Sequence, residues 1–124
     1  TELARHADLA IEAPTGPEVL MGSTRLKAGT ATKMILNMLT TGAMVRTGRV
    51  YQNLMVDLCI SNSKLSDRAL RILRHATGVG EEDASRLLKQ AGGSVKTAIV
   101  MQLGGVDADQ ARRALEETVR PFKS

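Results

Sequence analysis

From residue 81 onward, the sequence is divided by pairs of glycines into short segments whose apolar residues follow helical spacing. Gly92-Gly93 and Gly104-Gly105 separate three such segments. Because glycine readily adopts the left-handed backbone conformation that ends many helices, each pair predicts a helix end. This part of the chain is therefore expected to form three short helices, the last of them ended by Pro121.

The first residues of these three segments also favour helices. Acidic residues at 81–83 suit the positive end of a helix dipole, and Ser94 can cap the second helix. Asp107 and Gln110 have the spacing of a capping box at the start of the third helix. The residues expected to face inward recur at helical spacing: Ala84, Leu87, Leu88 and Ala91, then Val95, Ala98, Ile99 and Leu103, then Ala111, Ala114 and Leu115.

A fourth helix is predicted over residues 64–76. The residues at 61–63 supply capping side chains before it, and Gly78 and Gly80 end it. His75 lies in its last turn, where a cation suits the helix dipole. Its apolar face consists of Leu65, Ala69, Ile72 and Leu73, with Arg68, Arg71 and Arg74 elsewhere on the helix.

The longest predicted helix covers roughly residues 23–47. The only aromatic residues of the chain are Tyr51 and Phe122, so Ala, Leu, Val and Met have to fill the interior, which favours close-packed helices. Glycine in a helix costs about 1 kcal/mol relative to alanine, so Gly29 and Gly42 indicate close packing or a ligand. The apolar side of the helix is expected to consist of Leu26, Ala31, Met34, Ile35, Met38, Leu39, Gly42 and Val45. The methionines at 21, 34, 38 and 44 are expected to fill a core or a subunit interface, and Cys59 a core gap.

Two segments have the character of extended backbone. Residues 8–13 form a short apolar run that is broken by Pro14 and Gly16, which predicts one buried strand. A single strand has no partner for its N–H and C=O groups, so we expect it to be the last strand of a larger parallel sheet whose earlier strands lie outside this sequence. Residues 50–58 are apolar with β-branched residues, so a strand and a buried helix both fit, and an irregular or short extended connection is favoured.

Positive charge is concentrated in the middle of the chain, which has a net charge of +4. Residues 22–49 contain five basic residues and no acid. Ser23 or Thr24 can cap the long helix and leave other first-turn N–H groups free, so the helix start is a candidate site for a phosphate. No basic patch is interleaved with aromatic residues and no zinc-ligand spacing occurs, so nucleic acid is the weaker alternative.

The same region carries a specific resemblance to a known family. Gly16-Pro17-Glu18 is followed by Gly-Ser-Thr-Arg-Leu-Lys-Ala-Gly-Thr at residues 22–30, and the runs at 33–45 and 48–57 continue the match. These motifs resemble the family of N-acetylmuramic acid 6-phosphate etherases and glucokinase regulatory proteins, and residues 50–57 are more similar to the etherases. The resemblance covers almost the whole chain.

The resemblance implies a mainly helical chain, the C-terminal fragment of an α/β sugar isomerase (SIS) domain with a doubly wound parallel sheet, followed by a small three-helix domain. The expected boundaries are residues 1–60 for the sugar-phosphate domain, 61–78 for a connecting helix and 79–124 for the three helices. The pattern of the last part, with an acidic start, Ala-x-x-Leu-Leu, Gly-Gly and Ala-Ile, resembles the ubiquitin-associated fold in architecture, and ubiquitin binding does not follow.

The family's activity implies a carbon–oxygen lyase that cleaves the D-lactyl ether of N-acetylmuramic acid 6-phosphate without metal or other cofactor. The catalytic glutamates of the family are expected upstream of this sequence, so the isolated chain is expected to be inactive. Glu18 either contacts the ligand or caps nearby N–H groups. The residues expected to bind the sugar phosphate are Glu18, Ser23, Thr24, Arg25, Lys27, Thr30 and Lys33.

Two other functional classes remain open: a non-catalytic regulatory protein that binds a sugar phosphate, and a helical interaction module. The expected partners are the sugar phosphate and a second copy of the chain in a homodimer, with neither nucleic acid nor a membrane. No apolar run approaches the roughly 20 residues of a membrane span, the first residues do not resemble a signal peptide, and a single cysteine suits a reducing compartment. The cytoplasm is the expected location.

Overall fold

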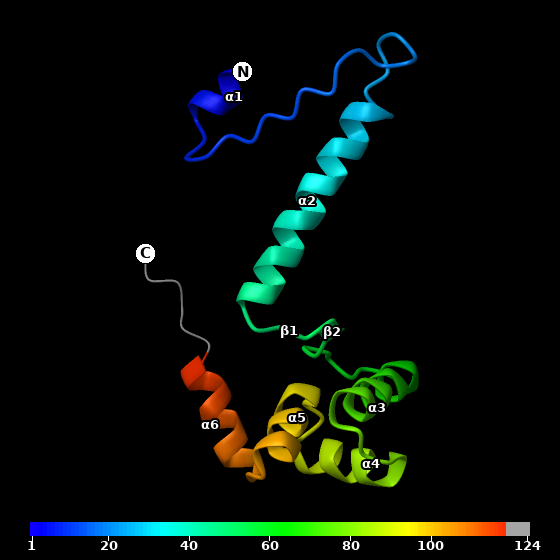
Figure 1. Cartoon of the computed structure of the whole chain (residues 1–124), viewed down its shortest axis with the longest axis vertical. Coiled ribbons are helices and arrows are strands. Elements are labelled where there is room, and N and C mark those ends of the chain that lie inside the picture. The colour runs from blue at the N-terminus through cyan, green and yellow to red at the C-terminus, as the bar shows by residue number, and fades with distance from the viewer. Residues whose placement is uncertain (119–124) are drawn as a thin grey trace. The chain divides into compact units, whose positions relative to one another are not determined.

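The computed structural model describes residues 1–118 and divides into two compact units, residues 1–43 and residues 44–124. Six helices and one two-stranded sheet are present among the described residues. The prediction of a mainly helical chain is therefore confirmed (Figure 1). The doubly wound sheet and the ubiquitin-associated architecture stay predictions.

The first unit begins with a one-turn helix, α1 (Glu2–Arg5), which is capped by the Thr1 hydroxyl. Residues 8–13 are not a strand, which corrects the prediction of a buried strand there. Leu9 is 81% exposed and Ile11 is 52% exposed. No strand pairs with this segment among the described residues, and an unpaired extended segment has to leave its N–H and C=O groups to water. No residue of the range 1–43 is buried.

Helix α2 (Lys27–Arg46) is the long helix that the sequence predicts, although it begins four residues later than expected. At its C-terminal end, the Gly48 N–H donates to the carbonyl of Val45, and Gly48 has a positive φ of 69°. None of the 20 residues of α2 is buried. Its methionines therefore do not fill a core formed by residues 1–118, and a subunit interface stays a prediction.

A small antiparallel hairpin opens the second unit after α2. Strand β1 (Val50–Tyr51) pairs with β2 (Leu54–Met55), with Val50 opposite Met55 and Tyr51 opposite Leu54. Gln52, in the two-residue turn, has a positive φ of 54°. The sequence favoured an irregular or short extended connection here; the segment contains extended backbone, and the pairing of its two halves as a hairpin was not predicted.

Four helices complete the second unit: α3 (Ser63–Thr77), α4 (Glu81–Gln90), α5 (Val95–Gly104) and α6 (Ala108–Thr118). The caps expected from the sequence are present. Asn62 accepts a hydrogen bond from the N–H of Leu65, and Ser94 accepts one from the N–H of Thr97. Asp107 and Gln110 form the reciprocal capping box, with distances of 3.2 Å and 2.8 Å. The predicted end of α6 at Pro121 lies outside the described residues.

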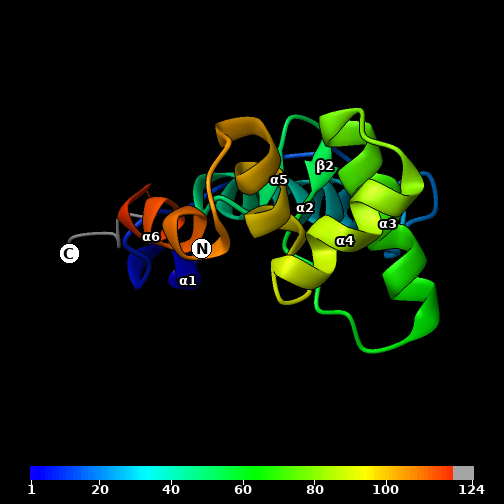
Figure 2. The same cartoon turned by 90° about the horizontal axis from the view of Figure 1, so that it is seen from below.

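Helix α5 is central to the packing of the second unit, because it contacts α3, α4 and α6 (Figures 1 and 2). Contact with three helices buries residues on several of its sides, including Met101. Leu103, in the last turn of α5, is 55% exposed, and Ala114 in α6 is also exposed, which corrects two of the predicted core positions. The buried apolar cluster is Val56, Ala69, Ile72, Leu73, Ala84, Leu87, Leu88, Ala91, Val95, Ala98, Ile99, Met101 and Ala111. Helix α3 thus shares one core with the three helices that follow it.

Candidate functional site

The loop before α2 folds back so that Glu18 lies at the start of the helix. Its carboxylate oxygens accept hydrogen bonds from the N–H of Lys27 at 3.1 Å and 3.0 Å. One of the two oxygens also accepts from the N–H of Ala28 at 3.0 Å. A negative charge on these amides suits the helix dipole, so the geometry agrees with the capping alternative for Glu18.

The next two amides of α2 also have partners. The N–H of Gly29 donates to the carbonyl of Thr24 at 2.7 Å, and the N–H of Thr30 donates to the carbonyl of Leu26 at 3.2 Å. A Cβ on Gly29 would lie 3.0 Å from the same Thr24 oxygen, so this close approach requires glycine. Glu18 takes the capping position that the sequence assigned to Ser23 or Thr24. The N–H groups of residues 27–30 therefore already have acceptors within the chain, and none of them is free to bind an anion in this conformation.

The cations of this loop differ in what they contact. The Lys27 ammonium donates to the carbonyl of Pro17 at 3.0 Å, which ties the loop to the helix. Arg25 and Lys33 are exposed, and neither has a carboxylate within ion-pair distance in residues 1–118. Of the seven predicted binding residues, the structure joins Glu18 and Lys27 directly, while Ser23, Thr24, Arg25, Thr30 and Lys33 lie along the same loop and helix start.

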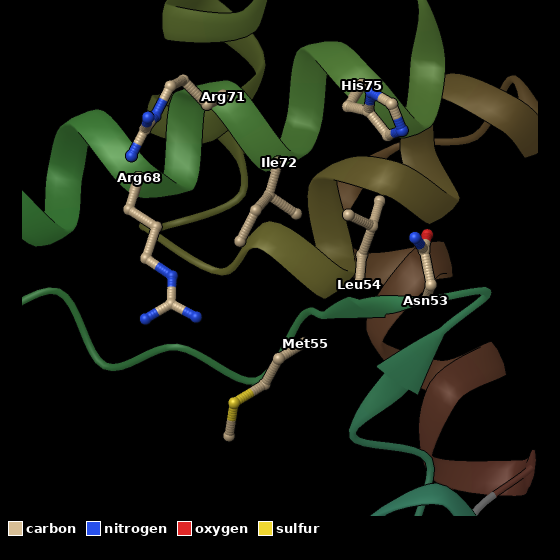
Figure 3. Close-up of a pocket in the computed structure, with 7 residues that line it drawn as sticks. All are labelled: Asn53, Leu54, Met55, Arg68, Arg71, Ile72 and His75. Atoms are coloured by element: carbon tan, nitrogen blue, oxygen red, sulfur yellow. The ribbon is translucent and has the colours of Figure 1, made fainter.

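The second unit contains a pocket that sequence reasoning did not identify. It has a volume of about 400 Å³ and lies between the hairpin and α3 (Figure 3). Helical spacing places Arg68, Ile72 and His75 on one side of α3, while β2 and its turn supply the other wall. The lining residues are Asn53, Leu54, Met55, Arg68, Arg71, Ile72 and His75.

The charged residues that line this pocket are all basic. Neither Arg68 nor Arg71 has a carboxylate within ion-pair distance in the described part of the chain. By contrast, the neighbouring Arg74 pairs with Glu81 at 3.3 Å, and Arg49 pairs with Asp57 at 3.4 Å. A second hollow of about 370 Å³ shares Arg71 and His75 with the pocket, and no acidic residue lines either hollow.

The sequence contained part of the signal for this pocket. Three arginines at positions 68, 71 and 74 predict a basic helix surface. What the sequence did not indicate is that the hairpin packs beside the first two arginines. The partner that neutralises Arg74 lies seven residues further along the chain, so the difference between the three arginines is tertiary.

Other groups in the described residues do not assemble a reactive site. Among residues 1–118, no three His, Cys, Asp or Glu side chains gather closely enough to hold a metal ion. Cys59 is exposed, which corrects the expectation that it fills a core gap. None of the described helices combines the length and the apolar character needed to cross a membrane.

Comparison with known proteins gives two findings. The family described as the C-terminal lid domain of glucokinase regulatory protein matches residues 52–94. N-acetylmuramic acid 6-phosphate etherases of Salmonella paratyphi B, Salmonella schwarzengrund and Salmonella agona are each 58% identical to this chain over 113 residues. The match covers 91% of this chain and 38% of each relative, so the chain spans well under half of the length of these proteins. The resemblance expected from the motifs is confirmed.

Proposed function

We propose that this chain, which is related to the N-acetylmuramic acid 6-phosphate etherases over almost its whole length, is part of a lyase that cleaves the D-lactyl ether of N-acetylmuramic acid 6-phosphate. The products are N-acetylglucosamine 6-phosphate and D-lactate, and the reaction serves the recycling of cell-wall amino sugars. The observation that carries the proposal is the 58% identity over 113 residues to proteins of that name.

The proposed reaction is an elimination followed by the addition of water. A base removes the C2 proton of the open-chain sugar, and the C3–O bond to lactate breaks as the C2–C3 double bond forms. An acid protonates the departing lactate oxygen; water then adds at C3 and a proton returns to C2. The acid and base belong to the family's sugar isomerase domain outside this sequence, so the isolated chain is expected to bind and not to turn over substrate.

The contribution of this chain is the cationic loop and helix start. Arg25 and Lys33 lack carboxylate partners within residues 1–118, so both are available for the phosphate or the lactyl carboxylate. The hydroxyls of Ser23, Thr24 and Thr30 would donate to sugar-phosphate oxygens. Glu18 and Lys27 would act mainly by holding the loop on the helix, because their observed contacts are to backbone groups.

We place the working enzyme in the cytoplasm as a homodimer. The exposed apolar side chains of α2 support a packing partner for this helix, since a run of exposed Met and Leu residues is unfavourable in water. That partner is either the rest of the same protein or the second copy.

A non-catalytic regulatory protein that binds a sugar phosphate is the second candidate. The match of residues 52–94 to the lid domain of glucokinase regulatory protein favours it specifically. The two candidates share the ligand class and differ in turnover, so an activity assay separates them. A helical interaction module without a ligand is the third candidate, and it predicts no stabilisation by sugar phosphates.

The test is D-lactate release from N-acetylmuramic acid 6-phosphate by the protein encoded by the complete reading frame that contains this sequence. We expect turnover in that protein and none in the 124-residue chain. Arg25→Ala and Lys33→Ala should each lower kcat/KM about tenfold or more, as the loss of a charge-assisted hydrogen bond predicts. Arg113→Ala, which removes an exposed arginine of α6, is the matched control. Absence of lactate release from the complete protein would overturn the lyase proposal.

A further inference from the structure

We propose that the pocket between the hairpin and α3 is itself a binding site for a phosphorylated sugar. Its two arginines, Arg68 and Arg71, would hold the phosphate, and Asn53 and His75 would bond to sugar hydroxyls. The choice of a sugar as the body of the ligand rests on the proposed function, whereas the anion site rests on the geometry of the pocket.

Arg68 and Arg71 carry positive charge that no carboxylate of the described residues pairs with. The arginines at positions 5, 49, 74, 86 and 112 form ion pairs with carboxylates. Arg68 and Arg71 are not among them, although Asp67 and Glu81 lie within ten residues of one or the other in sequence. Two like charges three residues apart on one helix face repel each other, and a bound anion in the pocket that both line would offset that repulsion.

The guanidinium group of arginine is suited to bind phosphate by its shape and its donors. Its planar donors match the oxygens of a phosphate in pairs, which is why arginine is common in phosphate sites. Arg68 and Arg71 are three residues apart on α3, a spacing that brings side chains together on a helix surface. In Figure 3 the Arg68 side chain reaches from α3 towards the hairpin, while the Arg71 side chain lies against the α3 ribbon at the same end of the pocket.

The remainder of the pocket wall is partly apolar and partly polar. Leu54 of β2 and Ile72 of α3 supply apolar surface, and Asn53 in the hairpin turn and His75 in the last turn of α3 supply polar groups (Figure 3). The C–H faces of a sugar suit the apolar part and its hydroxyls suit the polar part. The volume of about 400 Å³ lies in the range of roughly 300–1,000 Å³ that is usual for small-molecule sites.

The composition of the pocket favours a small anion over a nucleic acid. Sequence-tolerant binding of single strands relies on aromatic side chains on which bases stack. None of the seven lining residues is Phe, Tyr or Trp. A monosaccharide phosphate uses the two cations, the amide and the imidazole without requiring a stacking surface.

The experiment is a calorimetric titration of the 124-residue chain with N-acetylglucosamine 6-phosphate. Inorganic phosphate and N-acetylglucosamine are titrated separately, so that the contributions of the phosphate and of the sugar to the affinity can be compared. The variants are Arg68→Gln, Arg71→Gln and Arg68→Lys, with Arg113→Gln as the control because Arg113 is exposed on α6 and does not line the pocket. Circular dichroism verifies that each variant retains its helix content.

We expect Arg68→Gln and Arg71→Gln each to weaken binding about tenfold or more, and Arg68→Lys to weaken it less, because lysine keeps the charge and loses the paired donors. Binding that is absent in the unmodified chain, or equal in the two glutamine variants and in Arg113→Gln, would overturn the anion site. Binding of inorganic phosphate as tight as that of the sugar phosphate would overturn the sugar assignment. Because the readout is binding, a failure here leaves the lactate-release test of the lyase proposal unaffected, and the converse also holds.

Discussion

Residues 1–43 and residues 44–118 both carry many apolar side chains, yet only the second region has a core. In the first region no residue is buried, and on α2 Met38 is 62% exposed and Leu39 53% exposed. In the second region, Leu73 and Val95 are almost fully enclosed by side chains from the hairpin and α3–α6. Helical spacing of apolar residues thus predicts a helix in both regions, whereas a core also requires partner elements that bury the apolar side.

The helices of the two regions also differ in what stabilises them. Helix α2 depends on backbone hydrogen bonds, side-chain propensity and its Glu18 cap, because none of its residues is buried. Helices α3–α6 are short and depend on packing against one another. Short helices are marginal in isolation, so packing is expected to dominate the free energy of unfolding of the second region.

The largest expected effect contrasts a leucine from each region. Leu73→Ala should lower the free energy of unfolding by about 2–5 kcal/mol, because it leaves a cavity in an enclosed core. Leu39→Ala on α2 should change it by no more than about 0.5 kcal/mol. Urea titration of the 124-residue chain measures both, and a loss for Leu39→Ala as large as that for Leu73→Ala would show that α2 is covered in solution.

A smaller effect contrasts two glycines. Gly93 has a φ of 83°, so Gly93→Ala should cost about 1–2 kcal/mol through the left-handed backbone alone. Gly42 lies within α2 and a Cβ there would contact nothing, so Gly42→Ala should stabilise the helix by about 1 kcal/mol. Thermal unfolding followed by circular dichroism tests both signs. Destabilisation by Gly42→Ala would mean that another backbone approaches α2 closely at this position.

The smallest effect concerns the caps of the two regions. Glu18→Gln should cost about 1 kcal/mol of local stability at the start of α2, since the amides of Lys27 and Ala28 lose a charged acceptor. Amide hydrogen exchange should become roughly fivefold faster at these two residues. Asp107→Ala should do the same for Gln110 in α6, and Glu12→Gln serves as the control. Unchanged exchange in Glu18→Gln would show that the loop does not cap α2 in solution.

Much of the helical structure could be predicted because helix starts and ends are local. The capping box at Asp107 and Gln110, the Ser94 cap and the glycine ends at Gly78 and Gly93 each depend on groups within a few residues. The same locality explains the long helix. The start of α2 was displaced because its cap, Glu18, lies nine residues before Lys27 and reaches it through a loop.

The two candidate sites likewise differ in whether neighbouring residues in the sequence are enough to reveal them. Residues 16–33 were identified by their charge and motifs, which are properties of consecutive residues. The pocket beside α3 was missed because it needs the hairpin at residues 53–55 to face the helix at residues 68–75. Arg68 and Arg74 have the same local character, and only tertiary contacts leave one unpaired and pair the other.

The sequence by itself determined the longer helices, most of their caps in residues 62–110 and the concentration of positive charge, because backbone hydrogen bonding and capping act over a few residues. The tertiary structure decided which apolar residues are buried: Met101 is enclosed and Leu103 is not, and residues 8–13 form no strand. Burial and strand pairing depend on elements distant in the chain. Which residues are buried and which segments pair as strands is therefore set by the packing partners that the fold brings together. The spacing of residues along the sequence does not predict it.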